Sequence, residues 1–116
     1  MKSILKGWVS AVDSNSMTSA QIKELIERRR RQVLVHSVIY YKLNENLITD
    51  SQWSAWALEL EELQNTYPQI AAECCFADEF EGFEHSSGMD LPLENPWAVA
   101  TAAYLVRISR EKQSPL

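Results

Sequence analysis

The spacing of hydrophobic positions predicts a long helix over residues 19–44. Apolar residues recur every three or four positions, which is the spacing of one helix face. The predicted inward stripe comprises Ile22, Leu25, Ile26, Arg29, Val33, His36 and Tyr40. Thr18 and Gln21 form a capping-box pattern at the start, in which each side chain satisfies a backbone N–H of the other. No Gly or Pro interrupts the pattern before Asn44, so the helix extends that far.

A second helix is predicted directly after the first, with Thr49 or Asp50 as its N-cap. Its apolar stripe comprises Trp53, Trp56, Ala57, Leu60 and Leu63. Pro68 ends the helix, because a residue before proline is displaced from helical geometry. The connection between the helices is short, so they must pack antiparallel as a helical hairpin.

The rest of the chain is predicted to be less regular, apart from a third helix. Asn95 as N-cap and Pro96 at the first helical position start this helix, which runs to about Arg110. Residues 69–95 are loop-rich, with a short helix between residues 70 and 80. Residues 1–17 fit either a short strand or a helical turn. The predicted fold class is therefore mainly α, a single domain over residues 1–116 that combines an antiparallel hairpin with a C-terminal helix.

Composition narrows the classes of partner. The chain has 116 residues, a net charge of -5 and a pI near 5.0. This acidic balance argues against general nucleic-acid binding, which depends on Lys and Arg at phosphates. A local cluster can still hold a small anionic ligand. Four Trp and four Tyr are a rich aromatic content for this length, and predict a homo-oligomer.

The cysteines and the lengths of the hydrophobic runs predict the cellular compartment of the protein. Cys74 and Cys75 are adjacent, and neighbours have poor geometry for a mutual disulfide. No apolar run is long enough for a signal peptide or a membrane span, which needs about 18 residues. We therefore expect a soluble protein of the cytoplasm.

The stretch from Tyr40 to Pro68 resembles a known family. It contains an aromatic pair at the end of one helix, an Ile-Thr-Asp turn and a further aromatic residue one turn later, at Tyr40, Tyr41, Ile48, Thr49, Asp50 and Trp53. This arrangement resembles the N-terminal helical subdomain of NAD-dependent DNA ligases, over about residues 20–70. The resemblance implies a hairpin that closes over the nicotinamide mononucleotide half of NAD. Ser54 departs from the family pattern, which has Asp there.

The chain lacks the catalytic part of such a ligase. No Lys-x-Asp-Gly motif for a lysine nucleophile is present, and the length is too short for a nucleotidyltransferase domain. No nucleophile elbow or glycine-rich phosphate loop is present either. We therefore expect a non-enzyme without a cofactor. The chain resembles small ligase-related proteins of phages and prophages. A phage-encoded protein of this kind would act in the cytoplasm of the host cell.

The hairpin supplies the first candidate ligand residues. Tyr40, Tyr41 and Trp53 would form a stacking platform for a nucleobase or nicotinamide ring, or else belong to the core. Asp50 would accept hydrogen bonds from ribose hydroxyls, or else cap the second helix. Both roles of Asp50 are compatible, because its two oxygens can act separately.

Charged and loop residues supply the other candidates. Residues 28–31 are four arginines that radiate around the helix, which is typical of a solvated run. Arg29 lies on the inward stripe and must find a carboxylate, a carbonyl or a ligand phosphate, while Arg107 is a weaker phosphate candidate. Phe83 and His85 lie in a loop that either covers a ligand or only connects helices. The spacing around His85 matches no metal motif, so no metal site is predicted.

Two functions fit this sequence. The first is non-catalytic sequestration of an NAD-related, ADP-ribose-related or cyclic nucleotide signal, as in a phage sponge that counters bacterial defence; this step is analogy. The alternative is an acidic interaction module that inhibits a host enzyme or nucleic-acid-binding protein through the carboxylates of residues 73–94.

Overall fold

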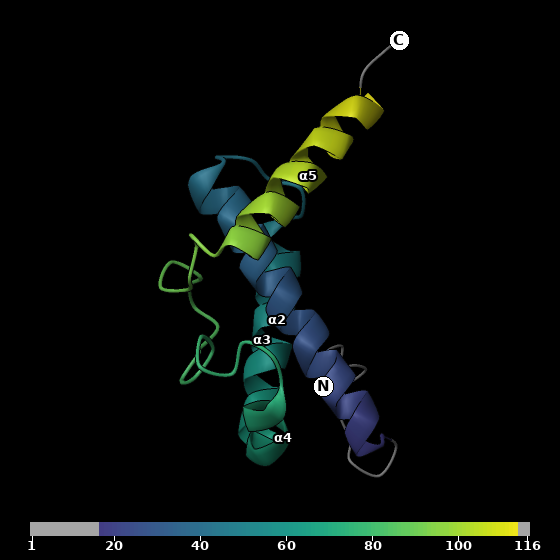
Figure 1. Ribbon diagram of the computed structural model, residues 1–116, viewed down its shortest axis with the longest axis vertical. Helices are drawn as coiled ribbons and strands as arrows, with labels where there is room; N and C mark the ends of the chain where they lie inside the picture. The colour runs from purple at the N-terminus through teal and green to yellow at the C-terminus, as the bar shows by residue number, and fades with distance from the viewer. Residues whose placement is uncertain (1–16, 114–116) are drawn as a thin grey trace.

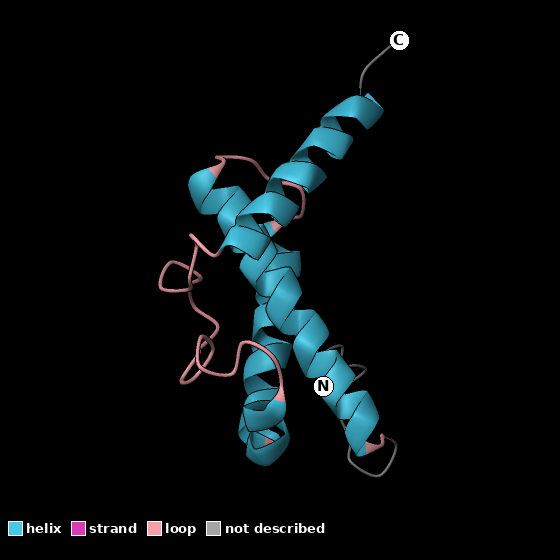
Figure 2. Cartoon of the chain, viewed as in Figure 1, coloured by secondary structure: helices cyan, strands magenta, loops and turns pink. Residues whose placement is uncertain are grey.

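The computed structural model describes residues 17–113, which form a helical hairpin with a further helix across it (Figure 1). The described helices are α2 (Ser19–Lys42), α3 (Asp50–Thr66), α4 (Pro68–Glu73) and α5 (Pro96–Gln113). Within residues 17–113 the regular structure is all helical (Figure 2). The predicted mainly α fold with a hairpin and a C-terminal helix is confirmed. The expected strand or turn near the N-terminus falls mostly on residues 1–16, outside the described part.

Helix α2 is the central element, because it packs against both α3 and α5. The predicted capping box is present: the backbone N–H of Gln21 donates to Thr18 Oγ1 at 3.1 Å, and that of Thr18 donates to Gln21 Oε1 at 2.9 Å. Contact with two helices buries more than the one predicted stripe. Leu34, Val35, Val38 and Ile39 are buried together with Val33.

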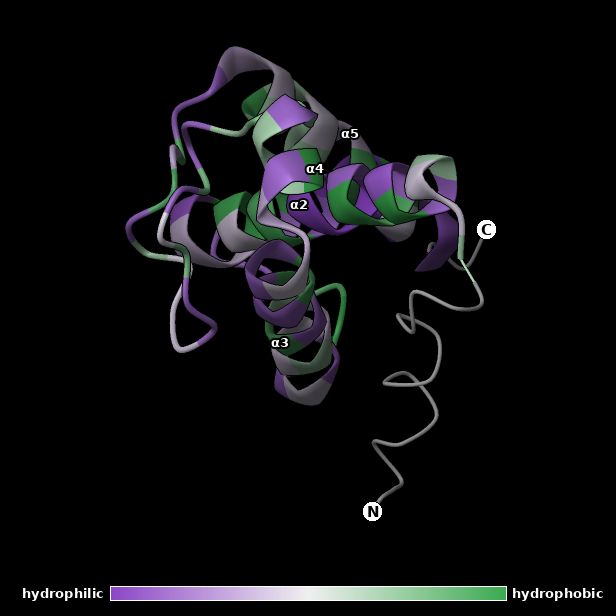
Figure 3. Ribbon diagram, turned by 90° about the horizontal axis from the view of Figure 1, so that it is seen from below, coloured by the Kyte–Doolittle hydropathy of each residue, from purple (hydrophilic) through white to green (hydrophobic). Residues whose placement is uncertain are grey.

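Helix α3 runs back along α2 in the opposite direction (Figure 1). Its N-cap is Thr49, whose Oγ1 accepts a 3.0 Å hydrogen bond from the backbone N–H of Gln52. Hydrophobic and hydrophilic positions alternate around the helix (Figure 3), and the hydrophobic side buries Ala57, Leu60 and Leu63 completely. Tyr67 leaves helical geometry with φ −126° and ψ 62°, as expected before a proline.

The segment between α3 and α5 contains the short helix α4 and then a long loop along one side of the hairpin (Figures 1 and 2). Helix α4 begins at Pro68, two residues before the predicted start, since proline is favourable in a first helical turn. Buried Phe80 and Leu91 anchor the loop to the core. An ion pair of 2.8 Å joins Lys42 Nζ at the end of α2 to a carboxylate oxygen of Glu94.

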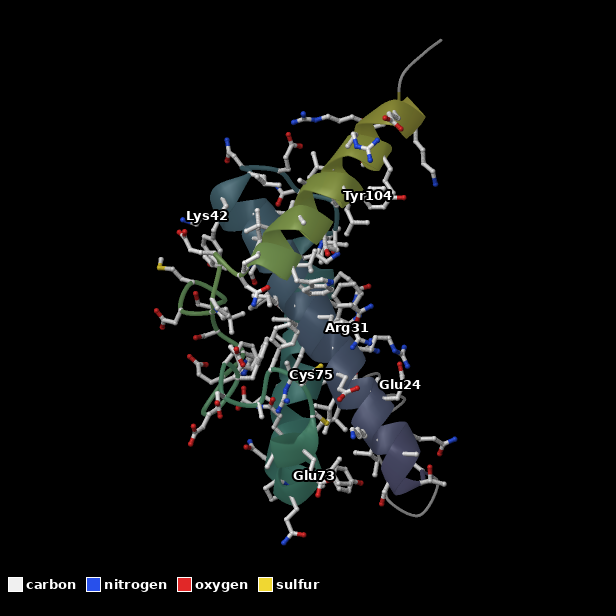
Figure 4. The ribbon with its side chains drawn as sticks, in the orientation of Figure 1. Glu24, Arg31, Lys42, Glu73, Cys75 and Tyr104 are labelled. Carbon is white, nitrogen blue, oxygen red and sulfur yellow. The ribbon has the colours of Figure 1, made fainter. Side chains whose placement is uncertain are left out.

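Helix α5 crosses α2 and extends past it toward the C-terminus (Figure 1). The predicted cap is present, because Asn95 Oδ1 accepts a 3.0 Å hydrogen bond from the backbone N–H of Ala98. Ala98 and Ala102 are completely buried and allow the two helices to approach closely. Tyr104 projects from the outer face (Figure 4). None of the described helices is long and apolar enough to cross a membrane.

Candidate functional site

A pocket of about 220 Å³ lies where the end of α2, the connection to α3 and the first turns of α3 meet. The loop before α5 supplies part of its wall. Its aromatic and polar lining residues include His36, Ser37, Tyr40, Tyr41, Glu45, Asp50, Trp53, Ser54, Ser86 and Ser87. The predicted hairpin residues Tyr40, Tyr41, Asp50 and Trp53 therefore come together around one opening.

The two tyrosines lie at the surface rather than in the core. Their ring centroids are 4.9 Å apart with an interplanar angle of 87°, an edge-on arrangement. Tyr40 is 51% exposed and Tyr41 39% exposed. The hydroxyl of Tyr41 is 3.4 Å from Ser87 Oγ, which links the ring to the loop. The ring of Tyr40 is the more accessible of the two for stacking.

Trp53 forms a fixed, half-buried wall of the pocket. Its Nε1–H is 3.2 Å from Ser37 Oγ and 3.3 Å from the carbonyl oxygen of Val33, and donates to both. Gly88 packs closely against the same place: a Cβ atom there would lie 2.2 Å from Ser37 Oγ and 3.1 Å from Trp53 Cζ2. The absence of a side chain at Gly88 thus allows the loop to approach the hairpin beside the pocket.

Asp50 is exposed, and its carboxylate has no hydrogen bond or ion pair with any residue in the described range. The cap that the sequence assigned to either Thr49 or Asp50 is supplied by the Thr49 hydroxyl. A carboxylate in the first turn of a helix is favourable on its own, because it faces the positive end of the helix dipole. Both oxygens of Asp50 are therefore available to a ligand.

His36 is a pocket residue to which the sequence assigned no binding role. Its ring lies 5.7 Å from that of Trp56, and its Nδ1 is buried without a hydrogen-bond partner among the described residues. Burial lowers the pKa of His36 from its ordinary value of 6.5, so the ring is neutral at pH 7. Its position one helical turn before Tyr40 is the sequence signal that places both on one side of α2.

Arg29 lies outside the pocket lining. Its Nε donates to Glu59 Oε1 at 2.7 Å and its Nη1 to Gln32 Oε1 at 2.7 Å. Of the three partners that the sequence allowed for this inward arginine, a carboxylate and a side-chain amide carbonyl are present. Among residues 17–113, neither Lys nor Arg lines the pocket.

The most deeply buried arginine is Arg30, which the sequence did not single out. Its guanidinium donates to the carbonyl oxygens of Ala71 at 3.1 Å and Cys75 at 2.9 Å, and to Gln64 Oε1 at 2.8 Å. Burial lowers the pKa of Arg30 from its ordinary value, yet an arginine stays charged in proteins. Arg30 therefore joins α2, α3 and α4 at the end of the hairpin remote from the pocket.

The other three predicted residues also lie outside the pocket lining. The ring of Phe83 packs edge-on against that of Phe80, with 5.2 Å between the ring centroids. His85 faces Glu61, with 2.7 Å between Nδ1 and a carboxylate oxygen. Arg107 lies over the ring of Tyr104 and lines a separate open hollow between α5 and the end of α2.

Comparison with known proteins shows sequence similarity between this chain and DNA ligases. It is 32% identical over 84 residues to a DNA ligase of Pseudothermotoga lettingae, and 29% identical over 89 residues to one of Fervidobacterium nodosum. These matches cover 66% and 70% of this chain, but only 12% and 13% of the ligases. No family model and no solved structure gives a significant match. The chain thus resembles a segment of DNA ligases and spans about an eighth of their length.

Proposed function

We propose that the pocket beside Tyr40 and Asp50 binds an NAD-related nucleotide, and that the chain corresponds to the nicotinamide-nucleotide-binding hairpin of DNA ligases. One observation carries this proposal: an exposed aromatic ring and a carboxylate with no partner among residues 17–113 lie together at a pocket. The similarity to a ligase segment supports it, because Tyr40, Asp50 and Trp53 stand at the positions that the family resemblance implies.

The chemistry of the lining favours a flat ring that carries positive charge. Aromatic faces attract cations, and the carboxylate of Asp50 adds negative charge, while neither Lys nor Arg lines the pocket among the described residues. The Glu45 carboxylate is paired with Arg110. The oxidised nicotinamide ring is a planar cation with an attached ribose. In this arrangement Tyr40 stacks on the ring and Asp50 accepts hydrogen bonds from the ribose hydroxyls.

The size of the pocket favours a mononucleotide over a whole dinucleotide. Its volume of about 220 Å³ lies below the range of roughly 300–1,000 Å³ that is usual for drug-sized ligands. The ring and sugar would occupy the pocket while the phosphate faces its open side. Glu45 lines both this pocket and the hollow that contains Arg107 and Arg110, so these two arginines are the candidate partners for a phosphate that leaves the pocket.

The biological role that we propose is sequestration of the ligand without chemical change. A phage-encoded sponge for NAD-derived or cyclic nucleotide signals is the form that this role would take. A homo-oligomer would then present several pockets to the signal.

Calorimetric titration tests the proposal directly. The panel comprises NAD, nicotinamide mononucleotide, cyclic ADP-ribose isomers and cyclic di- and trinucleotides. We expect saturable binding of at least one nicotinamide or ADP-ribose ligand, with a rise in melting temperature, because a ligand of the native state stabilises it. The absence of heat and of a thermal shift across the panel would refute it.

A second candidate function rests on the acidic loop. Residues 73–94 contain seven carboxylates and no Lys or Arg, and Glu79, Glu81 and Glu84 are exposed. Such a surface fits an inhibitor that docks on a basic host protein. Reversal of Glu79, Glu81 and Glu84 to Lys should abolish capture of that host protein and leave nucleotide binding intact. Nucleotide binding by the parent chain, without capture of any host protein, would favour the first function.

A further inference from the structure

Three side chains with metal-ligating atoms meet on the outer side of α3, away from the pocket lining. Glu61 lies on α3, while Glu84 and His85 lie in the loop before α5. One ligand atom from each of the three lies within 4.8 Å of the others. The backbone N–H of His85 also donates to Glu61 Oε1 at 2.8 Å, which fixes the loop against the helix at this point.

The donors and the local charge suit a divalent cation. An imidazole nitrogen with carboxylate oxygens is a donor set that Zn²⁺ accepts, at distances of about 2.0–2.2 Å. An ion with ligands at this distance holds them roughly 3–4 Å apart, so the three side chains need only small shifts to close around it. Residues 73–94 contain seven carboxylates, Glu84 among them, and no Lys or Arg of their own. Lys42 pairs with Glu94, and the remaining negative charge concentrates cations there.

We propose that Glu61, Glu84 and His85 form a binding site for a divalent transition-metal ion, of which Zn²⁺ fits best. One oxygen from each carboxylate and one ring nitrogen of His85 are the ligands, and water completes the shell at this exposed position. The sequence predicted no metal site, because His85 has no second histidine nearby. It could not show that Glu61, 24 residues earlier, lies against His85.

Hydrogen bonds that Glu61, Glu84 and His85 already make would compete with the ion for these side chains. Glu61 Oε1 accepts from the backbone N–H and lies 2.7 Å from Nδ1 of His85. Glu84 accepts hydrogen bonds from the backbone N–H and the hydroxyl of Ser86. Binding of the ion through Nδ1 would displace the hydrogen bond between His85 and Glu61.

The position of the site gives it a consequence for the pocket. Ser86 and Ser87 follow the ligands directly and line the nucleotide pocket. An ion that joins Glu61 to Glu84 and His85 would fasten this part of the loop to α3. Metal binding should therefore slow hydrogen exchange of the loop amides from residue 84 to 88. The metal site stands on its own geometry, so it does not depend on the identity of the nucleotide.

The test is calorimetric titration of ZnCl₂ into the full chain with the Cys75→Ser substitution. This background is needed because Cys75 is an exposed free thiol that could bind zinc by itself. We expect one ion per chain and a rise in melting temperature. His85→Ala and Glu61→Gln should each weaken affinity by more than about tenfold, since loss of even an outer partner of a metal ligand has an effect of this size.

Glu81→Gln is the matched control, because Glu81 is an exposed carboxylate of the same loop outside the three ligands. It should leave zinc affinity unchanged. An equal loss in Glu81→Gln, full affinity in His85→Ala, or equally tight binding of Ca²⁺ would each overturn the proposal. Any of those results would mean that the acidic loop collects cations without a specific site. The His85→Ala chain is expected to fold, because His85 is exposed.

Discussion

The two ends of the helical hairpin differ in the burial and hydrogen bonding of their polar side chains. At the end near α4, Arg30 is buried and donates to Gln64 and to the backbone carbonyls of Ala71 and Cys75. At the other end, Tyr40 is half exposed and Asp50 has no partner among the described residues. The same pair of helices therefore has one end closed by internal hydrogen bonds and one end open.

This difference separates structural roles from binding roles. A buried polar group without a partner costs about 1–3 kcal/mol, so the closed end must satisfy its donors and acceptors internally. An exposed group has no such requirement, because water solvates it. Side chains at the open end can therefore exchange water for a ligand without any loss of internal contacts.

The largest effect is expected at the closed end, from Arg30→Met. The substitution keeps the apolar stem but leaves several buried carbonyls unpaired, at about 1–3 kcal/mol for each unsatisfied group. We expect the free energy of unfolding to fall by about 3 kcal/mol or more, measured by urea denaturation. Arg107→Met at an exposed position is the control and should stay within about 0.5 kcal/mol of the parent. Equal values for the two variants would refute the structural role of Arg30.

Gly88→Ala should disturb the contact between the loop and the open end. The added Cβ would lie 2.2 Å from Ser37 Oγ, so the loop or α2 must shift. Overpacking of this kind costs about 1–3 kcal/mol. Thermal unfolding should show the loss, and the fluorescence of Trp53 should change because its ring touches the same place. Met89→Ala, at the exposed position next in the chain, should unfold like the parent; an unaltered Gly88→Ala would show that the loop does not pack there.

Tyr40→Ala should affect ligand binding far more than stability. Loss of one stacking ring is worth about 1–3 kcal/mol, so affinity for nicotinamide mononucleotide should fall by about tenfold or more. Because Tyr40 is exposed, the free energy of unfolding should change by no more than about 0.5 kcal/mol. Tyr104 is exposed to the same degree on α5, and Tyr104→Ala should bind like the parent. Similar losses in the two variants would argue against a site at Tyr40.

The smallest effect is expected from the pH dependence of stability at the open end. Burial lowers the pKa of His36 below 6.5 in the folded chain, whereas the unfolded chain titrates near the ordinary value. As pH falls below 6.5, the unfolded state gains a proton that the folded state does not, so stability decreases. Above this pH the contribution of His36 is constant.

Urea denaturation between pH 7 and about 5 measures this effect, because most carboxylates stay ionised over that interval. His36→Leu should remove part of the loss of stability on the acidic side. The same dependence of the free energy of unfolding on pH in both chains would show that His36 is not the group responsible.

Local signals explain which parts of the fold the sequence predicted. The capping box at Thr18, the break at Tyr67 and the cap at Asn95 each depend on residues a few positions apart, so a linear pattern shows them. The grouping of Tyr40 with Asp50 followed from the family resemblance, and the short connection between two helices predicted the hairpin that carries them.

Contacts between distant segments explain what the sequence did not predict. Arg30 is adjacent to Arg29 in an unbroken arginine run, and only the carbonyls of α4 distinguish the buried one. The approach of Gly88 to Ser37 and of His85 to Glu61 depends on the path of the loop, which no local pattern encodes. The free carboxylate of Asp50 also needed the structure, because Thr49 and Asp50 were equal candidates for the cap.

The most direct test of the open-end site is an NMR titration of the ¹⁵N-labelled chain with nicotinamide mononucleotide. We predict saturable chemical-shift changes for the backbone amides of Tyr41 and Asp50 and for the indole N–H of Trp53. Resonances around Arg30 should remain unchanged. No shifts at saturating ligand, or shifts confined to the closed end, would contradict the claim that the open end of the hairpin is a nucleotide pocket.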